Sequence, residues 1–98
     1  MEIRKENKDN NLVVKVSGRL DTTTAPELEA YLRDELDGVS ELTLDFEDLE
    51  YISSAGLRVL LATQKRMNEQ GSMRLTGVCD VVMEVLELTG FSSILTID

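Results

Sequence analysis

Residues 45–61 read DFEDLEYISSAGLRVLL, a stretch in which a strand ends, a polar loop follows and a helix begins. Leu42, Phe46 and the apolar residue midway between them alternate with polar residues, which predicts a strand with one buried face. We expect a polar connector at residues 47–50 and a helix that starts at the serine pair and stops at Gly71. A strand that leads into a helix in this way is typical of α/β folds with parallel strands.

The sequence before this stretch predicts a hairpin. Apolar residues at Leu12, Val14, Val16 and Leu20 share one parity, which is the period of a half-buried strand. A weaker strand is expected around Ile3. The residues between the two strands are rich in Asn and Asp, which favour turns. We therefore expect two antiparallel strands at the N-terminus.

A helix is predicted between the hairpin and the central strand. Thr24 and Glu27 have the spacing of a capping box, and Pro26 falls in the first turn, where its missing N–H is tolerated. Gly38 is a suitable stop after the last turn. The buried stripe of this helix is expected to consist of Leu28, Tyr31, Leu32 and Leu36.

The C-terminal third predicts a short strand at Met73 and Leu75, a helix and a last strand. Asp80 is expected to cap the helix, Gly90 to end it, and residues 94–97 to form the strand. The expected core side of the helix contains Val81, Val82, Val85 and Leu86. The whole chain, 1–98, is then one α/β domain of order β-β-α-β-α-β-α-β. Its mixed sheet of four to five strands carries helices mainly on one face.

Composition argues against most kinds of chemistry. The 98 residues include no histidine and one cysteine, so there is no imidazole base, no Ser–His pair and no thiolate zinc cage. An enzyme that relies on carboxylates such as Asp45 and Asp48 has no further support, and no cofactor is expected. The net charge of −9 disfavours binding to nucleic acids and anionic membranes. No apolar run is long enough for membrane insertion, and we expect a cytoplasmic protein.

Two adjacent serines, Ser53 and Ser54, stand at the start of the second helix. Serine is a preferred N-cap, which is a purely structural role. A helix N-terminus also accommodates a phosphate, because its free N–H groups and dipole favour negative charge. The small residues Ala55 and Gly56 leave the hydroxyl groups accessible to the active site of another protein. The pair is therefore either a cap or a phosphorylation site.

The sequence resembles the STAS domain of bacterial anti-sigma-factor antagonists over nearly its whole length. Two segments carry the resemblance: GRLD at residues 18–21 and YISSAGL at residues 51–57. The second is similar to the family signature of a hydrophobic residue followed by Asp-Ser-Ser/Ala-Gly-Leu. Aligning the Gly-Leu pairs places the phosphorylated serine of the family at Ser54, with Ser53 as the second candidate. Asp21 matches an acidic residue that lies near this serine in the family.

The resemblance implies a regulatory cycle without catalysis by this chain. In the family, the unphosphorylated antagonist binds an anti-sigma factor that is also a serine kinase, and so frees a sigma factor. The kinase then phosphorylates the antagonist, and a PP2C-type phosphatase resets the cycle. The resemblance and the expected crossovers together suggest a partner-binding surface of Asp21, Thr22, Thr23, Ser53, Ala55, Gly56, Leu57 and Arg58.

One departure from the family keeps a second interpretation open. Ser53 occupies the position where the family usually has aspartate, which removes one negative charge and adds a competing hydroxyl. The alternative is a STAS module that is a constitutive subunit of a transporter or stress-signalling complex and is not phosphorylated. Arg58, one helical turn beyond Ser54, is within reach of a phosphate there or is simply solvated.

Overall fold

The computed structural model describes all residues, 1–98. It confirms an α/β fold in which strands and helices alternate along most of the chain. In chain order, the elements are β1 (Glu2–Lys8), β2 (Asn11–Leu20), α1 (Ala25–Glu35), β3 (Glu41–Asp45), β4 (Leu49–Ile52), α2 (Ser54–Gln70), β5 (Ser72–Thr76), α3 (Asp80–Leu88) and the short 3₁₀ helix η1 (Phe91–Ser93).

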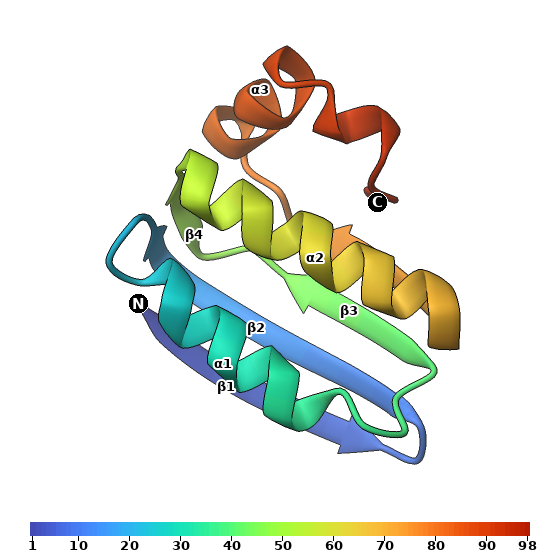
Figure 1. The fold of residues 1–98 in the computed structure, drawn as a ribbon. Coiled ribbons are helices and arrows are strands. Elements are labelled where there is room, and N and C mark those ends of the chain that lie inside the picture. The colour runs from blue at the N-terminus through green and yellow to red at the C-terminus, as the bar shows by residue number, and fades with distance from the viewer.

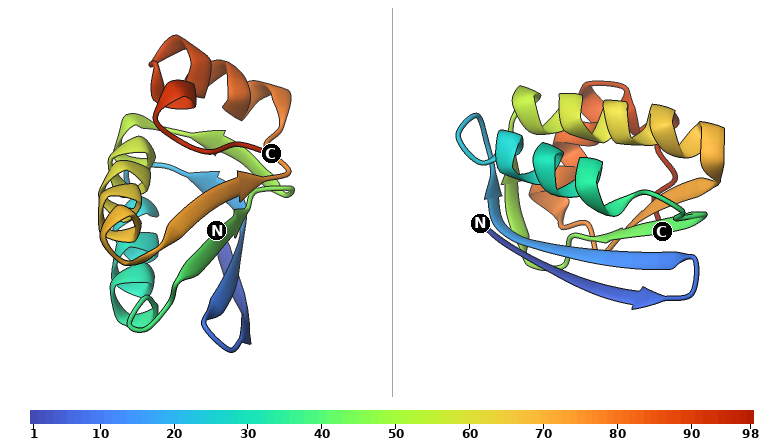
Figure 2. Two further views of the ribbon diagram at one scale, coloured as in Figure 1. Left: turned by 90° about the vertical axis from the view of Figure 1, so that its right-hand side faces the viewer. Right: turned by 60° about the horizontal axis from the view of Figure 1, so that its bottom comes forward.

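The sheet is mixed and has five strands. β1 pairs with β2 antiparallel, which confirms the predicted hairpin. β3 pairs in parallel with β2, and β5 in parallel with β3, so the strand order is β1-β2-β3-β5. β4 pairs in parallel with the far end of β2. Helices α1 and α2 cover the same face of the sheet, and α3 lies at its end beside β4 (Figures 1 and 2). The expected layer arrangement is therefore confirmed.

The core lies between the sheet and the two helices α1 and α2. Alternate residues of β2, β3 and β5 are buried, while their neighbours are partly exposed on the opposite face. The predicted stripe of the first helix is buried as well, apart from Tyr31, which is half-buried. Helix α2 buries Leu57, Leu60 and Met67. The largest fully buried side chains include Phe46, Leu20, Leu28, Leu44, Leu60 and Met67.

The predicted polar connector at residues 47–50 is wrong in its second half, because Leu49 begins strand β4. β2 and β4 pair as Gly18 with Leu49 and then Arg19 with Tyr51, which leaves Glu50 as an extra residue. An extra residue of this kind is a β-bulge and reverses the parity of the side chains. It buries both Leu49 and Ile52, three residues apart. The alternation that identifies a strand is therefore missing from the sequence.

The predicted last strand at residues 94–97 is reduced to a single bridge between Ile97 and Leu75 of β5. Gly90 ends α3 in the left-handed conformation, and the chain then turns through η1. Only Thr96 and Asp98 bond to β5, and both bond to Leu75. The element order is therefore corrected to β-β-α-β-β-α-β-α.

The predicted caps of α1 and α3 need correction, although Thr24 does occupy the N-cap position of α1. Thr24 makes no side-chain bond to the start of α1. Its hydroxyl instead accepts the N–H of Asp21 and donates to the carbonyl of Arg19, both at 2.8 Å. Asp80 is the first residue of α3 rather than its cap, and Cys79 takes the cap position. Val81, expected in the core, is 57% exposed, because Val82 and Leu86 form the buried side of α3.

Gln64 contains a buried amide oxygen without a hydrogen-bond partner. Its side chain donates to Asn68 at 2.8 Å, but Oε1 remains unpaired. A buried unpaired acceptor costs about 1–3 kcal/mol. We therefore expect Gln64→Met to raise the free energy of unfolding by about 1 kcal/mol in urea denaturation, because methionine is similar in volume and leaves no acceptor unpaired.

The matched control for this prediction is Gln70→Met in the same helix. The Gln70 amide donates to the carbonyls of Leu36 and Val39, both at 2.7 Å. Its loss is expected to lower the free energy of unfolding by about 1–2 kcal/mol. Equal losses in both variants would contradict the prediction for Gln64.

None of the helices is both long enough and apolar enough to cross a membrane.

Candidate functional site

The two segments that carry the family resemblance meet at one end of the sheet. The N–H of Ser53 donates to the carbonyl of Leu20 at 2.9 Å, directly after β2 and β4 pair at Leu20 and Ile52. Both strands end here, so the turn that begins at Asp21 lies beside the start of α2. The topology therefore brings together two loops that are more than thirty residues apart in the sequence.

Gly56 allows the first turn of α2 to approach both strands closely. A Cβ atom at this position would lie 2.8 Å from Leu20 Cγ and 2.8 Å from Ile52 Cγ1, which is too close for a real contact. Gly56 is accordingly buried. The start of the helix is fixed against the ends of β2 and β4, and so is the serine pair.

Ser53 acts as the N-cap of α2. Its backbone is extended, and its hydroxyl oxygen accepts the N–H of Gly56 at 3.4 Å. The side chain is half-buried. The structural role that the sequence left open for the serine pair therefore falls on Ser53.

Ser54 is the first residue of α2 and is exposed. Its hydroxyl makes no hydrogen bond within the chain, unlike that of Ser53. The first turn of α2 contains no acidic residue, so no side chain there offsets the positive end of the helix dipole. An anionic group on Ser54 would be electrostatically favourable for the helix.

Asp21 organises the turn next to the serine pair. Its carboxylate accepts the hydroxyl of Thr23 at 2.8 Å and the N–H groups of Thr23 and Thr24 at 3.1 Å. The Thr23 hydroxyl, followed by the Thr24 N–H, holds the pKa of the Asp21 carboxyl below its ordinary value. The carboxylate is therefore ionised at neutral pH, and its stabilisation of the turn is lost only when the pH falls through this lowered pKa.

The expected partner-binding residues differ in exposure. Asp21, Ser53 and Ala55 are half-buried, while Gly56 and Leu57 are buried and support the site through packing. Thr22, Thr23 and Arg58 are exposed, as is Ser54, the predicted phosphorylation site. Arg58 forms no ion pair, so its guanidinium is available to an added anion or to a partner.

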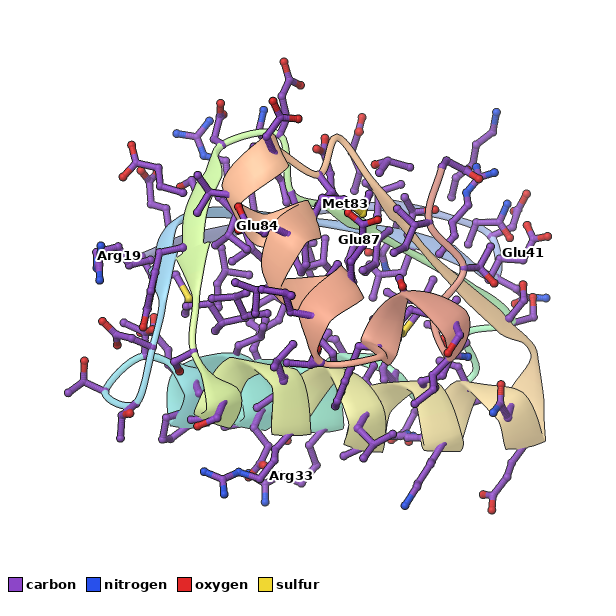
Figure 3. All side chains as sticks on the ribbon, turned by 90° about the horizontal axis from the view of Figure 1, so that it is seen from above. Arg19, Arg33, Glu41, Met83, Glu84 and Glu87 are labelled. Carbon is purple, nitrogen blue, oxygen red and sulfur yellow. The ribbon has the colours of Figure 1, made fainter.

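Arg19 and Tyr51, for which the sequence alone indicates no role, border the site on the strand side. The Arg19 guanidinium lies 4.2 Å from the centre of the Tyr51 ring, and its Nε lies 3.9 Å from the Asp21 carboxylate. Figure 3 shows Arg19 pointing outward beside β4. These residues lie within the two recognised segments, but only the pairing of β2 with β4 brings them into contact.

The chain contains no group of three His, Cys, Asp or Glu side chains that could hold a metal ion. The largest depression lies elsewhere, between the β1–β2 turn and the starts of β3 and β5, and its lining includes no hydrophobic residue. The serine pair lines none of the principal depressions. The site is thus an exposed surface rather than a cavity.

Comparison with known proteins identifies related sequences. The family described as the STAS domain matches residues 2–98. The chain is 38% identical over 96 residues to BtrV of Bordetella bronchiseptica, whose name assigns it to the anti-sigma factor antagonists; the match covers 96% of this chain and 83% of BtrV. It is 30% identical over 100 residues to the anti-sigma-B factor antagonist of Staphylococcus aureus, covering 100% of this chain and 93% of that protein.

Solved structures share the fold. An anti-sigma factor antagonist from Mycobacterium paratuberculosis superposes with a TM-score of 0.87 at 27% identity, over 98% of this chain and 83% of that one. A sulfate transporter family protein from Wolinella succinogenes superposes with a TM-score of 0.78 at 20% identity, over 91% of this chain and 77% of that one. Regulators and a transporter family therefore share this architecture.

Proposed function

Because the chain belongs to the STAS domain family, we propose that it is an anti-sigma-factor antagonist controlled by phosphorylation of Ser54. In the unphosphorylated form it binds an anti-sigma factor and so releases a sigma factor for transcription. The curated relatives named as anti-sigma factor antagonists support this class of partner. The chain acts by binding and carries out no chemistry itself.

The observation that carries the proposal is the exposed Ser54 hydroxyl at the start of a helix whose first turn packs closely against the ends of β2 and β4. Gly56 allows close packing of this turn against Leu20 and Ile52. Added charge at Ser54 therefore changes the surface without requiring the core to move. A partner that docks on the surrounding surface would meet this charge directly.

The difference between the two serines favours Ser54 as the acceptor. The Ser53 oxygen already accepts a backbone N–H, and its side chain is half-buried. Phosphorylation of Ser53 would have to disrupt the cap, which is worth about 1 kcal/mol. The Ser54 hydroxyl is exposed and has no such bond, so a kinase can reach it at no structural cost.

The partners in this scheme are an anti-sigma factor that is also a serine kinase and a PP2C-type phosphatase. The γ-phosphoryl group of kinase-bound ATP passes to the Ser54 oxygen, the hydroxyl proton goes to a base of the kinase, and ADP leaves. The phosphatase hydrolyses the ester with water and returns inorganic phosphate. Because the kinase uses cytoplasmic ATP, we place the protein in the cytoplasm.

Incubation with a cognate kinase and ATP, followed by mass spectrometry, tests the proposal. We expect one phosphate on Ser54, full loss of labelling in Ser54→Ala and retained labelling in Ser53→Ala. Ser53→Ala is also expected to lower the free energy of unfolding by about 1 kcal/mol, because the cap is lost. Labelling that follows Ser53 instead would reverse the assignment, and the absence of any serine phosphate would remove the regulatory mechanism.

A second candidate function is that of a constitutive subunit in a transport complex. The fold shared with the Wolinella succinogenes sulfate transporter family protein supports it. In this case the chain would co-purify with a transporter component, and binding would be insensitive to Ser54→Asp. The same pull-down on wild type and variant distinguishes the two functions.

A further inference from the structure

Strand β1 forms an uncovered edge of the sheet. It pairs with β2 over all seven of its residues and is the last strand on that side. Figures 1 and 2 show no other segment beyond it. The opposite edge differs, because the C-terminal segment bonds to Leu75 of β5 through Thr96 and Asp98. β1 is therefore the edge at which a further strand can add.

The register shows which backbone groups of β1 face outward. On β2, the N–H of Gly18 donates to the carbonyl of Asp48, and the carbonyl of Leu20 accepts the N–H of Ser53; both bonds lie on the side of β4. The backbone N–H and carbonyl groups of even-numbered β2 residues therefore face away from β1, and those of odd-numbered residues face toward it. The pairing partners of those odd-numbered residues are Glu2, Arg4, Glu6 and Lys8. By the alternation of an antiparallel ladder, Ile3, Lys5 and Asn7 have free N–H and carbonyl groups at the edge.

The side chains of β1 carry an alternating charge pattern on the sheet face opposite the helices. Along this face the signs are negative at Glu2, positive at Arg4, negative at Glu6 and positive at Lys8. All four residues are exposed. Antiparallel pairing of two copies about a two-fold axis at Lys5 sets Glu2 opposite Lys8 and Arg4 opposite Glu6. Every cross-strand pair on this face then joins opposite charges, which stabilises a sheet.

Neighbouring registers are disfavoured by the same pattern. One copy can slide along the other only in steps of two residues if the outward backbone groups are to stay opposite one another. Each such step moves the two-fold axis by one residue. Moving the axis to Arg4 sets Arg4 opposite its own copy and Glu2 opposite Glu6. Moving it to Glu6 sets Glu6 opposite its own copy and Arg4 opposite Lys8. Both shifts oppose like charges, so the sequence favours the register centred on Lys5.

The helix-side face of β1 is compatible with this register. Lys5 would meet Lys5 of the second copy at the axis, but each Lys5 ammonium is ion-paired with the Glu35 carboxylate of α1. Two ammonium groups and two carboxylates then share the axis, and their charges balance. On either side, Ile3 lies opposite Asn7, and the three outward residues supply the ladder hydrogen bonds.

From this geometry we infer that the chain self-associates through β1, joining the sheets of two copies into one continuous antiparallel sheet with Lys5 at the two-fold axis. β2 lies between β1 and β4, so the interface leaves Ser54 and the surface around it free. The inference goes beyond the proposed function and does not depend on it. Because each copy carries a net charge of −9, the dimer is expected to be weak.

Sedimentation velocity from about 10 µM to about 500 µM, the range suited to a small interface, tests the inference. We expect the wild type to pass from monomer to dimer. In the dimer, residue 4 of each copy lies opposite residue 6 of the other, so Arg4→Glu and Glu6→Lys each create two pairs of like charges. Each variant is expected to weaken the dimer at least about tenfold. An equimolar mixture of the two variants restores opposite charges at both pairs, and we expect it to associate as strongly as the wild type.

The matched controls are Lys65→Glu and Glu69→Lys. They change the net charge by the same amounts at exposed positions of α2 that form no ion pair. Both should dimerise like the wild type. Recovery in the mixed sample also excludes unfolding as the cause of weakening in the single variants. A chain that stays monomeric throughout, a dimer unaffected by either reversal, or a mixture that associates no better than its components overturns the inference.

Discussion

Ser54→Asp is expected to weaken binding to the anti-sigma factor at least about tenfold, or 1.4 kcal/mol, and to leave the fold intact. The carboxylate places a negative charge on an exposed part of the proposed docking surface. At the first position of α2 the same charge is favourable for the helix, so the melting temperature should change by no more than a few degrees. Isothermal titration calorimetry and thermal unfolding of the same samples measure both effects.

The matched control is Ser53→Asp, which adds the same charge one residue earlier. Aspartate is as good an N-cap as serine, and the STAS signature carries aspartate at this position. We expect Ser53→Asp to weaken binding less than Ser54→Asp does and to be at least as stable as the wild type. Equal loss of binding in both variants would mean that net charge, rather than the position of Ser54, controls docking. A large loss of stability in Ser54→Asp would point to a structural role for this serine.

Gly71→Ala is expected to give the largest loss of stability of any single methyl addition, about 3–5 kcal/mol or more. Gly71 joins α2 to β5, and a Cβ there would lie 1.8 Å from the carbonyl oxygen of Ser40. Its φ of 171° is extended, so the obstacle is the collision rather than backbone strain. The same carbonyl accepts the N–H of Ser72 at 2.9 Å, at the point where β3 and β5 begin to pair. Relief of the collision would break this bond.

Gly38→Ala is the control for Gly71→Ala in chemical denaturation. Gly38 has a φ of +79° and no atom within 4 Å of a built Cβ. Its replacement should therefore cost only the strain of the left-handed conformation, about 1–2 kcal/mol. A loss in Gly71→Ala no greater than that in Gly38→Ala would show that the junction between α2 and β5 relaxes to admit a methyl group.

The spacing of apolar residues predicted the strands and helices that are regular along their whole length. β2, β3 and the two large helices follow regular spacing, and their buried faces agree with the sequence except at residues on the edge of a stripe. β4 was missed because the extra residue Glu50 shifts the alternation between Leu49 and Ile52. The strand exists because β2 continues past the end of β3 and leaves its final backbone groups to be paired. Such tertiary pairing has no local signal.

The motif located the candidate site, but the role of each residue within it follows only from the fold. The sequence identified the serine pair without determining which serine caps the helix, since both positions have the required residue type. The hydrogen bond from Gly56 to Ser53 makes that distinction. Similarly, the carboxylate of Asp21 rather than the expected cap residue Thr24 organises the turn before α1, because three donors converge on it. Side-chain choices of this kind depend on loop geometry that composition does not encode.

The close approach at Gly56 has a consequence for how such proteins diversify. The contact that positions the start of α2 is made by residues facing inward, whereas Thr22, Thr23 and Arg58 face solvent. Thr22 and Arg58, which form no hydrogen bond or ion pair through their side chains, can change while the scaffold beneath them stays the same, whereas Thr23 is held by its bond to Asp21. Under the proposed function, exchanging these few outward residues would redirect the module from one anti-sigma factor to another while the packing at Gly56 stays the same, so that related modules in one cell would be kept apart by their surfaces alone.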